Sequence, residues 1–433
     1  MADDKKKEKG TGTPAGFVDR RSSRAIFQKL NKVHGAGTVA LAATGRRFVI
    51  DRYSTGSLAL DFALGGGVPA GRIVKIVGQE SSGKTTLMLR IMADAQGRCA
   101  NCVRRVRDLT VGEVIDEATG EVDYRAAATC DCVAQGLYVP VAAEGEKDGD
   151  FEARVKALRE NSYEETRVAF VDAEAALDMT WAERVGIDRR RLVHVVPENA
   201  ETAVDVYIDL LFTGMVDFIG LDSIAALVPR EEVEASAFDQ QQGLAARIVN
   251  KFVRRATAAS MAVDLGRGRR APTQVWLNQL RQKIGVTYGD GLVEPGGMGQ
   301  KFAASVKIKM WAMGWEKRDL MADLAADERI KMGKSVDVCW QIEKNKCGPA
   351  KGEGRFTQIA SGPRMGEVDE FGFIAHLAEA KGLLRKAEKG NNWLLGNQEY
   401  KRKGDAHDKM REPATLAALR GVLLQKLNEE RDG

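Results

Sequence analysis

The segment GQESSGKTT, residues Gly78–Thr86, constrains the fold more than any other part of this chain. An apolar strand-like run, Ile73–Val77, precedes it, and an apolar helix-like stretch, Leu87–Ala95, follows it. Gly78 and Gly83 allow a tight turn, so that successive amide N–H groups and the start of the helix point at one anion. The pattern predicts a phosphate-binding loop between a strand and a helix.

Two side chains of this loop have the chemistry that a magnesium nucleoside triphosphate requires. Lys84 places a positive charge at the β- and γ-phosphates, and the Thr85 hydroxyl can ligate Mg²⁺. A surface glycine loop is the alternative, but the flanking strand and helix disfavour it. We therefore expect a nucleoside triphosphate to be bound by Gly78, Glu80, Ser81, Ser82, Gly83, Lys84, Thr85 and Thr86.

Length and composition indicate an ordinary globular protein. A chain of 433 residues has room for one large α/β core and one or two smaller units. We expect a cytoplasmic protein, because no apolar run is long enough to span a bilayer and the polar start, MADDKKKEKGTGTPAG, lacks the apolar part of a signal peptide. The net charge is only +4, so contacts with nucleic acid would have to come from local basic clusters.

The chain is predicted to begin with a disordered, lysine-rich leader, residues 1–16. An amphipathic helix at Arg20–His34 would then form the main part of an oligomerisation segment, residues 17–50. Strand-like and helix-like segments alternate from Phe48 to Ile359. This alternation predicts an α/β core, residues 51–360, with a mainly parallel sheet covered by helices.

Short amphipathic pieces replace this alternation after Ser361, and they end in a predicted helix at Ala414–Leu427. Residues 361–433 are therefore expected to form a small C-terminal unit.

Residues 97–165 interrupt the core where an ordinary connection would be short, so we expect an inserted subdomain there. Four of the six cysteines lie in this insert as two close pairs, and four thiolates suit tetrahedral Zn²⁺. Disulfides are disfavoured in a reducing compartment. We predict a structural zinc site at Cys99, Cys102, Cys130 and Cys132.

Two acidic residues follow apolar strand-like runs. Asp222 ends the run Val216–Ser223 and can hold the water shell of Mg²⁺ beside Lys84. Glu174 ends the run Arg167–Glu174 at the sheet edge where ligands bind, and could deprotonate a water that attacks the γ-phosphate. For Glu174, an ordinary acid at the start of a helix is an equally good interpretation from the residues alone.

The stretch Trp276–Phe302 begins as a strand that ends in Asn278 and Gln279, and it continues as a glycine-rich segment with Arg281 and Lys283. Backbone N–H groups and cationic side chains suit binding to a phosphodiester chain. A mobile surface loop is the alternative.

Several of these segments together resemble the RecA family of bacterial strand-exchange recombinases. They occur in the family's order and at roughly its spacing, and they cover most of the chain apart from the leader and the insert. The segments are Ser54–Leu87, Asp172–Asp178, Leu221–Pro229, Gly243–Arg247, Asn278–Val286, Gly296–Lys307 and Glu343–Pro349.

The resemblance implies a role for each matching residue. Lys84 and Thr85 would bind phosphate and Mg²⁺, Glu174 would be the catalytic base, and Asp222 would be a second acid beside Mg²⁺. Gln279 would sense the γ-phosphate. Further matches place adenine at Asp178 and Trp181, subunit contacts at Lys301 and Phe302, and a lysine pair that reaches the neighbouring subunit's ATP at Lys344 and Lys346.

For DNA, the resemblance implies contacts from two loops and the helix after the first loop. Ile284 would insert between bases and hold the strand stretched. The sequence departs from the family between Gly289 and Gly296, where DGLVEP replaces an acid and a run of threonines. The matching residues are Arg247, Arg254, Arg281, Lys283, Ile284, Gly296 and Gly297.

The C-terminal unit resembles the family's small terminal domain, whose basic face receives duplex DNA. Lys381, Arg385 and Lys386 are among the residues that could form such a face here, although solvated surface charge is an equally good interpretation.

We therefore predict a DNA-dependent ATPase that forms helical filaments on single-stranded DNA, pairs it with a homologous duplex and exchanges strands. Its cofactors would be ATP, Mg²⁺ and structural Zn²⁺, and single-strand-binding and loader proteins are candidate partners. A RadA-like ring helicase is the first alternative, and a DNA-binding filament that has lost efficient ATP turnover is the second.

Overall fold

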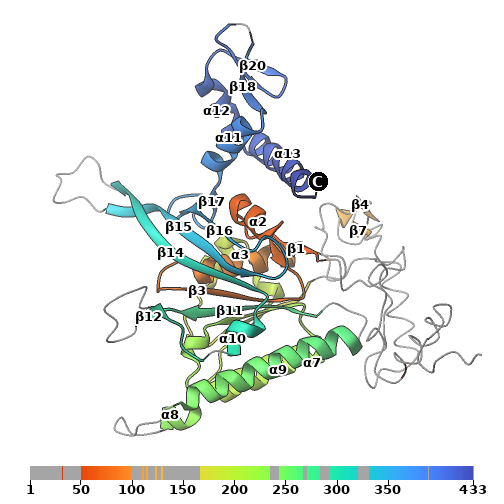
Figure 1. Ribbon diagram of the computed structural model, residues 1–433, viewed down its shortest axis with the longest axis vertical. Helices are drawn as coiled ribbons and strands as arrows, with labels where there is room; N and C mark the ends of the chain where they lie inside the picture. The colour runs from red at the N-terminus through yellow and green to blue at the C-terminus, as the bar shows by residue number, and fades with distance from the viewer. Residues whose placement is uncertain are drawn as a thin grey trace, which may run out of the picture. The chain divides into compact units, whose positions relative to one another are not determined.

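A computed structural model describes the chain over residues 50–98, 166–234, 243–266, 271–282, 292–297, 299–319, 331–388 and 390–432 (Figure 1). It also describes Lys32 and four two-residue strands, β4 (Thr110–Val111), β5 (Val114–Ile115), β6 (Val122–Asp123) and β7 (Ala128–Thr129). The chain divides into two compact units, Met1–Val49 and Ile50–Gly433, and the description below concerns the second. The predicted leader, the predicted helix Arg20–His34 apart from Lys32, the four cysteines of the insert, and Lys283 and Ile284 lie outside the described residues.

Nine of the described strands form one mixed sheet, in the order β17-β16-β15-β14-β3-β11-β10-β8-β9. The six strands from β14 to β9 are parallel, and the remaining three pair antiparallel. The prediction of a mainly parallel α/β sheet is therefore confirmed. The strands are β3 (Ile73–Gly78), β8 (Val168–Asp172), β9 (Leu192–Val195), β10 (Phe218–Asp222), β11 (Thr273–Gln279), β14 (Val306–Asp319), β15 (Lys331–Asn345), β16 (Gly352–Ile359) and β17 (Val368–Asp369).

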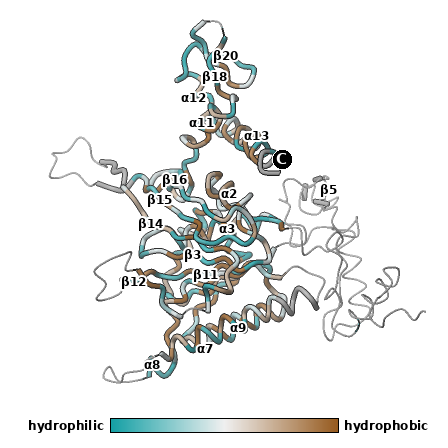
Figure 2. Tube along the Cα trace, viewed as in Figure 1, coloured by the Kyte–Doolittle hydropathy of each residue, from teal (hydrophilic) through white to brown (hydrophobic). Residues whose placement is uncertain are grey.

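The central strands are apolar because helices cover both faces of the sheet, so that every residue of β3, β8 and β10 is buried. Figure 2 shows this concentration of hydrophobic residues around β3 and β11. On one face pack α2 (Leu58–Leu64), α3 (Lys84–Gln96) and α6 (Met179–Val185). On the other lie α7 (Ala200–Thr213) and α9 (Leu244–Gly266), side by side in Figure 1.

Shorter elements join these parts. They are β1 (Arg52–Tyr53), β2 (Val68–Pro69), η4 (Arg189–Arg191), η5 (Ile224–Ala226), α8 (Arg230–Glu234), β12 (Arg281–Gln282), β13 (Leu292–Val293) and α10 (Gly299–Ala303). None of the described helices combines the length and apolar character needed to cross a membrane.

The register of the parallel strands brings their carboxyl ends to one edge of the sheet. Gln279 of β11 lies opposite Gly78 of β3, and Asp222 of β10 lies opposite Asp172 of β8. Ligands of open α/β sheets bind at this edge. Residues far apart in the sequence therefore meet where the phosphate loop begins.

The C-terminal region has a hydrophobic cluster of its own, to which Ile374, Ala378 and Leu423 contribute, together with Leu58 from α2. The predicted domain boundary at residue 361 remains a prediction, because the compact unit runs from residue 50 to the end of the chain. Its elements are α11 (Phe371–Ala380), β18 (Leu384–Lys386), β19 (Trp393–Leu395), β20 (Gln398–Tyr400), α12 (Lys403–Arg411) and α13 (Pro413–Asp432).

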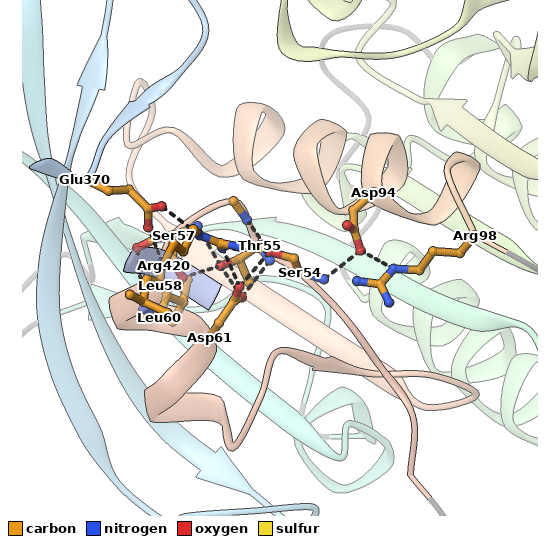
Figure 3. Close-up of polar contacts among 11 residues, drawn as sticks. Ser54, Thr55, Ser57, Leu58, Leu60, Asp61, Asp94, Arg98, Glu370 and Arg420 are labelled. Carbon is orange, nitrogen blue, oxygen red and sulfur yellow. Dashed lines mark hydrogen bonds and ion pairs between the residues drawn. The ribbon is translucent and has the colours of Figure 1, made fainter. Parts of the chain in front are cut away.

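A buried polar cluster joins α13 to the start of α2 (Figure 3). The Arg420 guanidinium pairs with Glu370 at 2.9 Å and with Asp61 at 3.4 Å. Asp61 accepts hydrogen bonds from the Ser54 hydroxyl at 2.6 Å and from the backbone and hydroxyl of Thr55, each at 2.7 Å. Burial raises the pKa of Asp61 and of Glu370, and the charge of Arg420 opposes both shifts.

These shifts make the contribution of Arg420 to stability pH-dependent. A folded-state pKa above the ordinary value means that folding favours the protonated carboxyl group, so ionised Asp61 and Glu370 reduce stability at neutral pH. This loss of stability becomes smaller as the pH is lowered toward the folded-state pKa values of the two carboxyl groups. Arg420→Met removes the compensating cation, so its penalty is expected to be greater at pH 7.5 than at pH 5.5.

We expect Arg420→Met to lower Tm by roughly 5 °C or more at pH 7.5, since losing one partner of a buried ion pair is strongly destabilising, and by clearly less at pH 5.5. Thermal scans at one scan rate would measure both values. Arg385→Met, at an exposed position of β18, is the matched control. An equal decrease in Tm at both pH values would contradict the inference that Arg420 stabilises ionised Asp61 and Glu370.

Candidate nucleotide and DNA sites

The phosphate loop connects β3 to α3, as its sequence predicts. A Cβ at Gly78 would overlap the carbonyl oxygen of Met310, and Gly83 has a left-handed φ of 83°. These positions therefore require glycine. The Ser82 hydroxyl closes the loop by donating to the carbonyl of Gln79 at 2.7 Å.

Lys84 lies within this loop. Its ammonium group donates to the Gln79 carbonyl at 2.6 Å and to the Ser82 hydroxyl at 3.4 Å. Burial lowers the pKa of Lys84, and the carboxylates of Asp222 and Glu174 oppose that shift. The loop therefore holds a partly desolvated cation where an anionic phosphate would be strongly attracted.

Thr85 and Asp222 meet across the sheet edge. The Thr85 hydroxyl donates to Asp222 Oδ2 at 2.6 Å, although 137 residues separate the two in the sequence. Burial raises the pKa of Asp222 to about 6, and the hydrogen bond from Thr85 opposes the shift. A hydroxyl and a carboxylate in contact are suitable oxygen donors for Mg²⁺ and its water shell, and the cation would hold Asp222 ionised.

Glu174 lies two residues beyond the end of β8, at an exposed position. Its Oε1 accepts hydrogen bonds from the Ser223 hydroxyl at 2.5 Å and from the side-chain amide of Gln279 at 2.8 Å. The structure thus brings together two residues for which the resemblance implied a catalytic base and a γ-phosphate sensor. Ser223 was not predicted, although it directly follows Asp222.

Trp181 lies on α6 beside the loop. Its indole N–H donates to the Thr86 hydroxyl at 3.2 Å. Asp178 is the N-cap of the same helix and accepts from the backbone N–H groups of Thr180 and Trp181. The predicted adenine-binding carboxylate thus also has a structural role, because it orients the turn that carries Trp181.

A cavity of 280 Å³ extends from the phosphate loop to Trp181. Its other walls are formed by Val336 and Val338 of β15, Gln358 of β16 and Ala360. A cationic loop at one end and an indole and apolar side chains at the other fit a magnesium nucleotide, with phosphates at Lys84 and the base near Trp181. Seven of the ten predicted ATP-binding residues line this cavity, whereas Gly78, Glu80 and Asp178 do not.

Lys344 and Lys346 do not line this cavity. They lie near the far end of β15, where Lys344 donates to the carbonyl oxygens of Lys301 at 2.6 Å and Phe302 at 3.4 Å. The Phe302 side chain is 73% exposed, unusual for an aromatic residue. The predicted subunit-contact residues and the predicted lysine pair thus share one region of the surface.

Two basic residues predicted to bind DNA, Arg247 and Arg254, lie on α9, and two predicted glycines, Gly296 and Gly297, lie at the end of the second loop, which is the glycine-rich segment after Gln279. Arg247 and Arg254 line a cavity of 710 Å³ together with Lys251 and Gly299. Gly296 and Gly297 have φ values of 90° and 82°, and Gly297 packs against Asn250 of α9. The structure therefore places α9 beside the end of the second loop. Arg281 is exposed on β12.

Two buried amides near this segment were missed by the sequence analysis. Asn278 donates to the carbonyl oxygen of Pro295 at 3.0 Å and to the side-chain oxygen of Gln300 at 3.1 Å. Gln300 donates to the same carbonyl at 2.6 Å. Asn278 at the end of an apolar strand was the available signal, because a fully buried amide must find hydrogen-bond partners.

Comparison with known proteins identifies the family of this chain. The model of the RecA N-terminal domain matches residues 21–105 and 113–342. This chain belongs to the RecA family. Protein RecA of Thermus thermophilus is 31% identical to it over 421 residues, which are 95% of each chain.

Other RecA proteins are similarly related. Protein RecA of Haemophilus ducreyi is 32% identical over 390 residues, covering 89% of this chain and 81% of the relative. Protein RecA of Fusobacterium nucleatum is 32% identical over 359 residues, covering 83% and 72%. The predicted RecA family is confirmed, and the RadA-like alternative is not favoured.

Trp181 offers a direct test of the nucleotide site. We expect Trp181→Ala to weaken ADP binding by roughly 5- to 150-fold, because stacking a base on an aromatic ring contributes about 1–3 kcal/mol. Isothermal titration calorimetry with Mg·ADP would measure the change. Trp393→Ala, in the C-terminal unit, is the control and should leave ADP affinity unchanged. Unaltered affinity in Trp181→Ala would place the base elsewhere.

Proposed function

We propose that this RecA-family chain binds single-stranded DNA as an ATP-dependent filament, pairs it with a homologous duplex and exchanges strands. Its family consists of DNA-dependent ATPases that act in recombination and form filaments on single-stranded DNA. The contact between Gln279 and Glu174 carries the proposal most directly. It joins the catalytic carboxylate to the strand that leads into the predicted second DNA loop.

In the proposed ATPase reaction, Glu174 is the general base. The Ser223 hydroxyl donates to its Oε1 and would keep the carboxylate oriented when ATP is bound, whereas Gln279 shares this oxygen in the absence of nucleotide. Oε2 would then accept the proton of the water that attacks the γ-phosphate. Lys84 and the amides of the loop would stabilise the negative charge that develops on the phosphate oxygens, and bound Mg²⁺ would add to that stabilisation.

Gln279 is the proposed coupling residue. Its amide bonds Glu174, and its backbone lies opposite Gly78 at the first residue of the phosphate loop. Arg281, two residues further along, is on the predicted DNA side. A γ-phosphate that drew the Gln279 amide away from Glu174 would therefore shift the start of the loop and change its affinity for DNA.

A filament would explain the position of Lys344 and Lys346. In the register of the sheet, Lys344 lies opposite Lys307, and Lys307 lies opposite Lys75, three residues before Gly78. Lys344 is therefore displaced from the phosphate loop by about 10 Å along the strands and by two strand spacings, about 10 Å, across them. It lies beside exposed Phe302. We propose that both lysines act on the ATP of a neighbouring subunit, as an arginine finger does.

Strand exchange between circular single-stranded DNA and a homologous linear duplex tests the proposal. With ATP and Mg²⁺, the unaltered protein is expected to form joint molecules, and Lys84→Ala should form none. Glu174→Gln is expected to bind DNA but to lose ATP turnover by about 100-fold or more, because it lacks a base. Glu198→Gln, at an exposed position, is the control.

Negative results would distinguish the alternatives. ATP hydrolysis without joint molecules, even with single-strand-binding and loader proteins present, would support the helicase. DNA-bound filaments with no ATP turnover in the unaltered protein would support the second alternative, a DNA-binding filament that has lost efficient ATP turnover.

We also propose that the insert binds structural zinc. The proposal depends on the spacing of the four cysteines alone, because these residues lie outside the described part of the chain. The described residues contain no other cluster of histidine, cysteine and acidic side chains suited to a metal. Metal analysis of purified protein should give about one zinc per chain, and Cys99→Ser/Cys102→Ser should give none. Zinc-free unaltered protein would refute the site.

A further inference from the structure

Four side chains of alternating charge form a network of ion pairs at the end of the second DNA loop. The proposed ATPase mechanism does not use this network. Lys75 of β3 pairs with Glu294, which follows β13. Glu294 also pairs with Lys307 of β14, and Lys307 pairs with Glu343 of β15 at 2.5 Å. Lys75 and Lys307 lie opposite each other on neighbouring parallel strands, so a single carboxylate can bridge them.

The burial of these groups shows that the arrangement is specific. The side chains of Lys75, Glu294, Lys307 and Glu343 are 0%, 7%, 14% and 32% exposed. A lysine without exposed surface is rare and requires a partner. Burial lowers the pKa of Lys75, whereas for Glu294 the bonds from Lys307 and Lys75 outweigh burial and lower its pKa. The lowered pKa of Glu294 agrees with an ionised carboxylate that bridges the two lysines.

The network joins three parts with different proposed roles. Lys75 lies three residues before Gly78, on the strand that begins the phosphate loop. Glu294 immediately precedes Pro295 and the two glycines proposed to contact the DNA backbone. Glu343 directly precedes Lys344, where the register between β14 and β15 is irregular. Glu294 is therefore the only loop residue in this chain of four charges.

Ionic bonds hold Glu294 where apolar packing is incomplete. A cavity of 450 Å³ borders the loop end, and its lining includes Leu292, Val293, Glu294, Lys307 and Glu343. Val293 is 43% exposed. The hydrogen bonds that Pro295 accepts from Asn278 and Gln300 form a second, uncharged attachment one residue later.

From this geometry we propose that Glu294 is a positioning residue for DNA. It fixes the end of the second loop to β3 and β14, and so presents Gly296 and Gly297 to the phosphates of single-stranded DNA. The inference rests on the proposed function. It concerns how single-stranded DNA is held, and it assigns Glu294 no role in ATP binding.

The test must avoid leaving a buried lysine unpaired, because that alone could unfold the protein. The reference protein is therefore Lys75→Met, which removes the buried charge and keeps the pair of Glu294 with Lys307. The test protein is Lys75→Met/Glu294→Gln. Glu353→Gln, at an exposed position of β16, is the neutral control.

Steady-state ATPase activity is measured against the concentration of single-stranded DNA for each protein. We expect Lys75→Met/Glu294→Gln to need at least tenfold more DNA for half-maximal stimulation than Lys75→Met. The rate at saturating DNA and the affinity for Mg·ADP should stay within about twofold. General destabilisation would lower the saturating rate as well, so this split separates positioning from a merely structural role.

The same half-saturating concentration in both proteins would overturn the inference and leave the proposed function intact. If single-stranded DNA does not change the ATPase activity of the unaltered protein, both the inference and the proposed function are overturned. If the double variant melts well below its reference, Glu294→Asp replaces it. That change keeps the charge that Lys75 requires but shortens the side chain, and about a threefold rise is expected. No rise would again refute the role.

Discussion

The pairing of β3 with β11 is the interaction on which the remaining arrangement depends. These parallel strands lie at the centre of the sheet, and their register sets Gln279 against Gly78. The chain after Gly78 becomes the phosphate loop, and the chain after Gln279 becomes the predicted DNA loop. Backbone hydrogen bonds thus make the two binding segments neighbours before any side chain contributes. A slip of one residue would turn Gln279 to the other face of the sheet and away from Glu174.

The sequence predicted the local features of the core well, because each followed from a short pattern. The strand before the phosphate loop, the helix after it and the strand ending in Asp222 all occur where expected. These elements need only apolar runs, glycine and a charged terminus to be recognised. Family resemblance then grouped Glu174, Gln279 and Asp222 into one site, which the residues alone had left open.

Contacts that depend on tertiary register could not be read from the sequence. Lys75 is the one charged residue in the predicted strand Ile73–Val77, and its partner Glu294 is 219 residues away. The substituted stretch DGLVEP appeared only as a departure from the family pattern, whereas the structure pairs its glutamate with two lysines. Ser223 and Gln300 were missed for the same reason, since a hydroxyl or amide reveals its partner only in the folded chain.

The cluster around Arg420 limits how freely the C-terminal region, residues 361–433, can be exchanged. Small terminal domains are often treated as modules that can be removed or grafted. Here one arginine of α13 pairs with Asp61, which belongs to the core, as well as with Glu370. A chimera with a terminal domain from another relative would inherit a buried core acid and would have to supply a cation at the same point. The core and the C-terminal region must therefore match at this junction, because a change of Arg420 in one region affects Asp61 in the other.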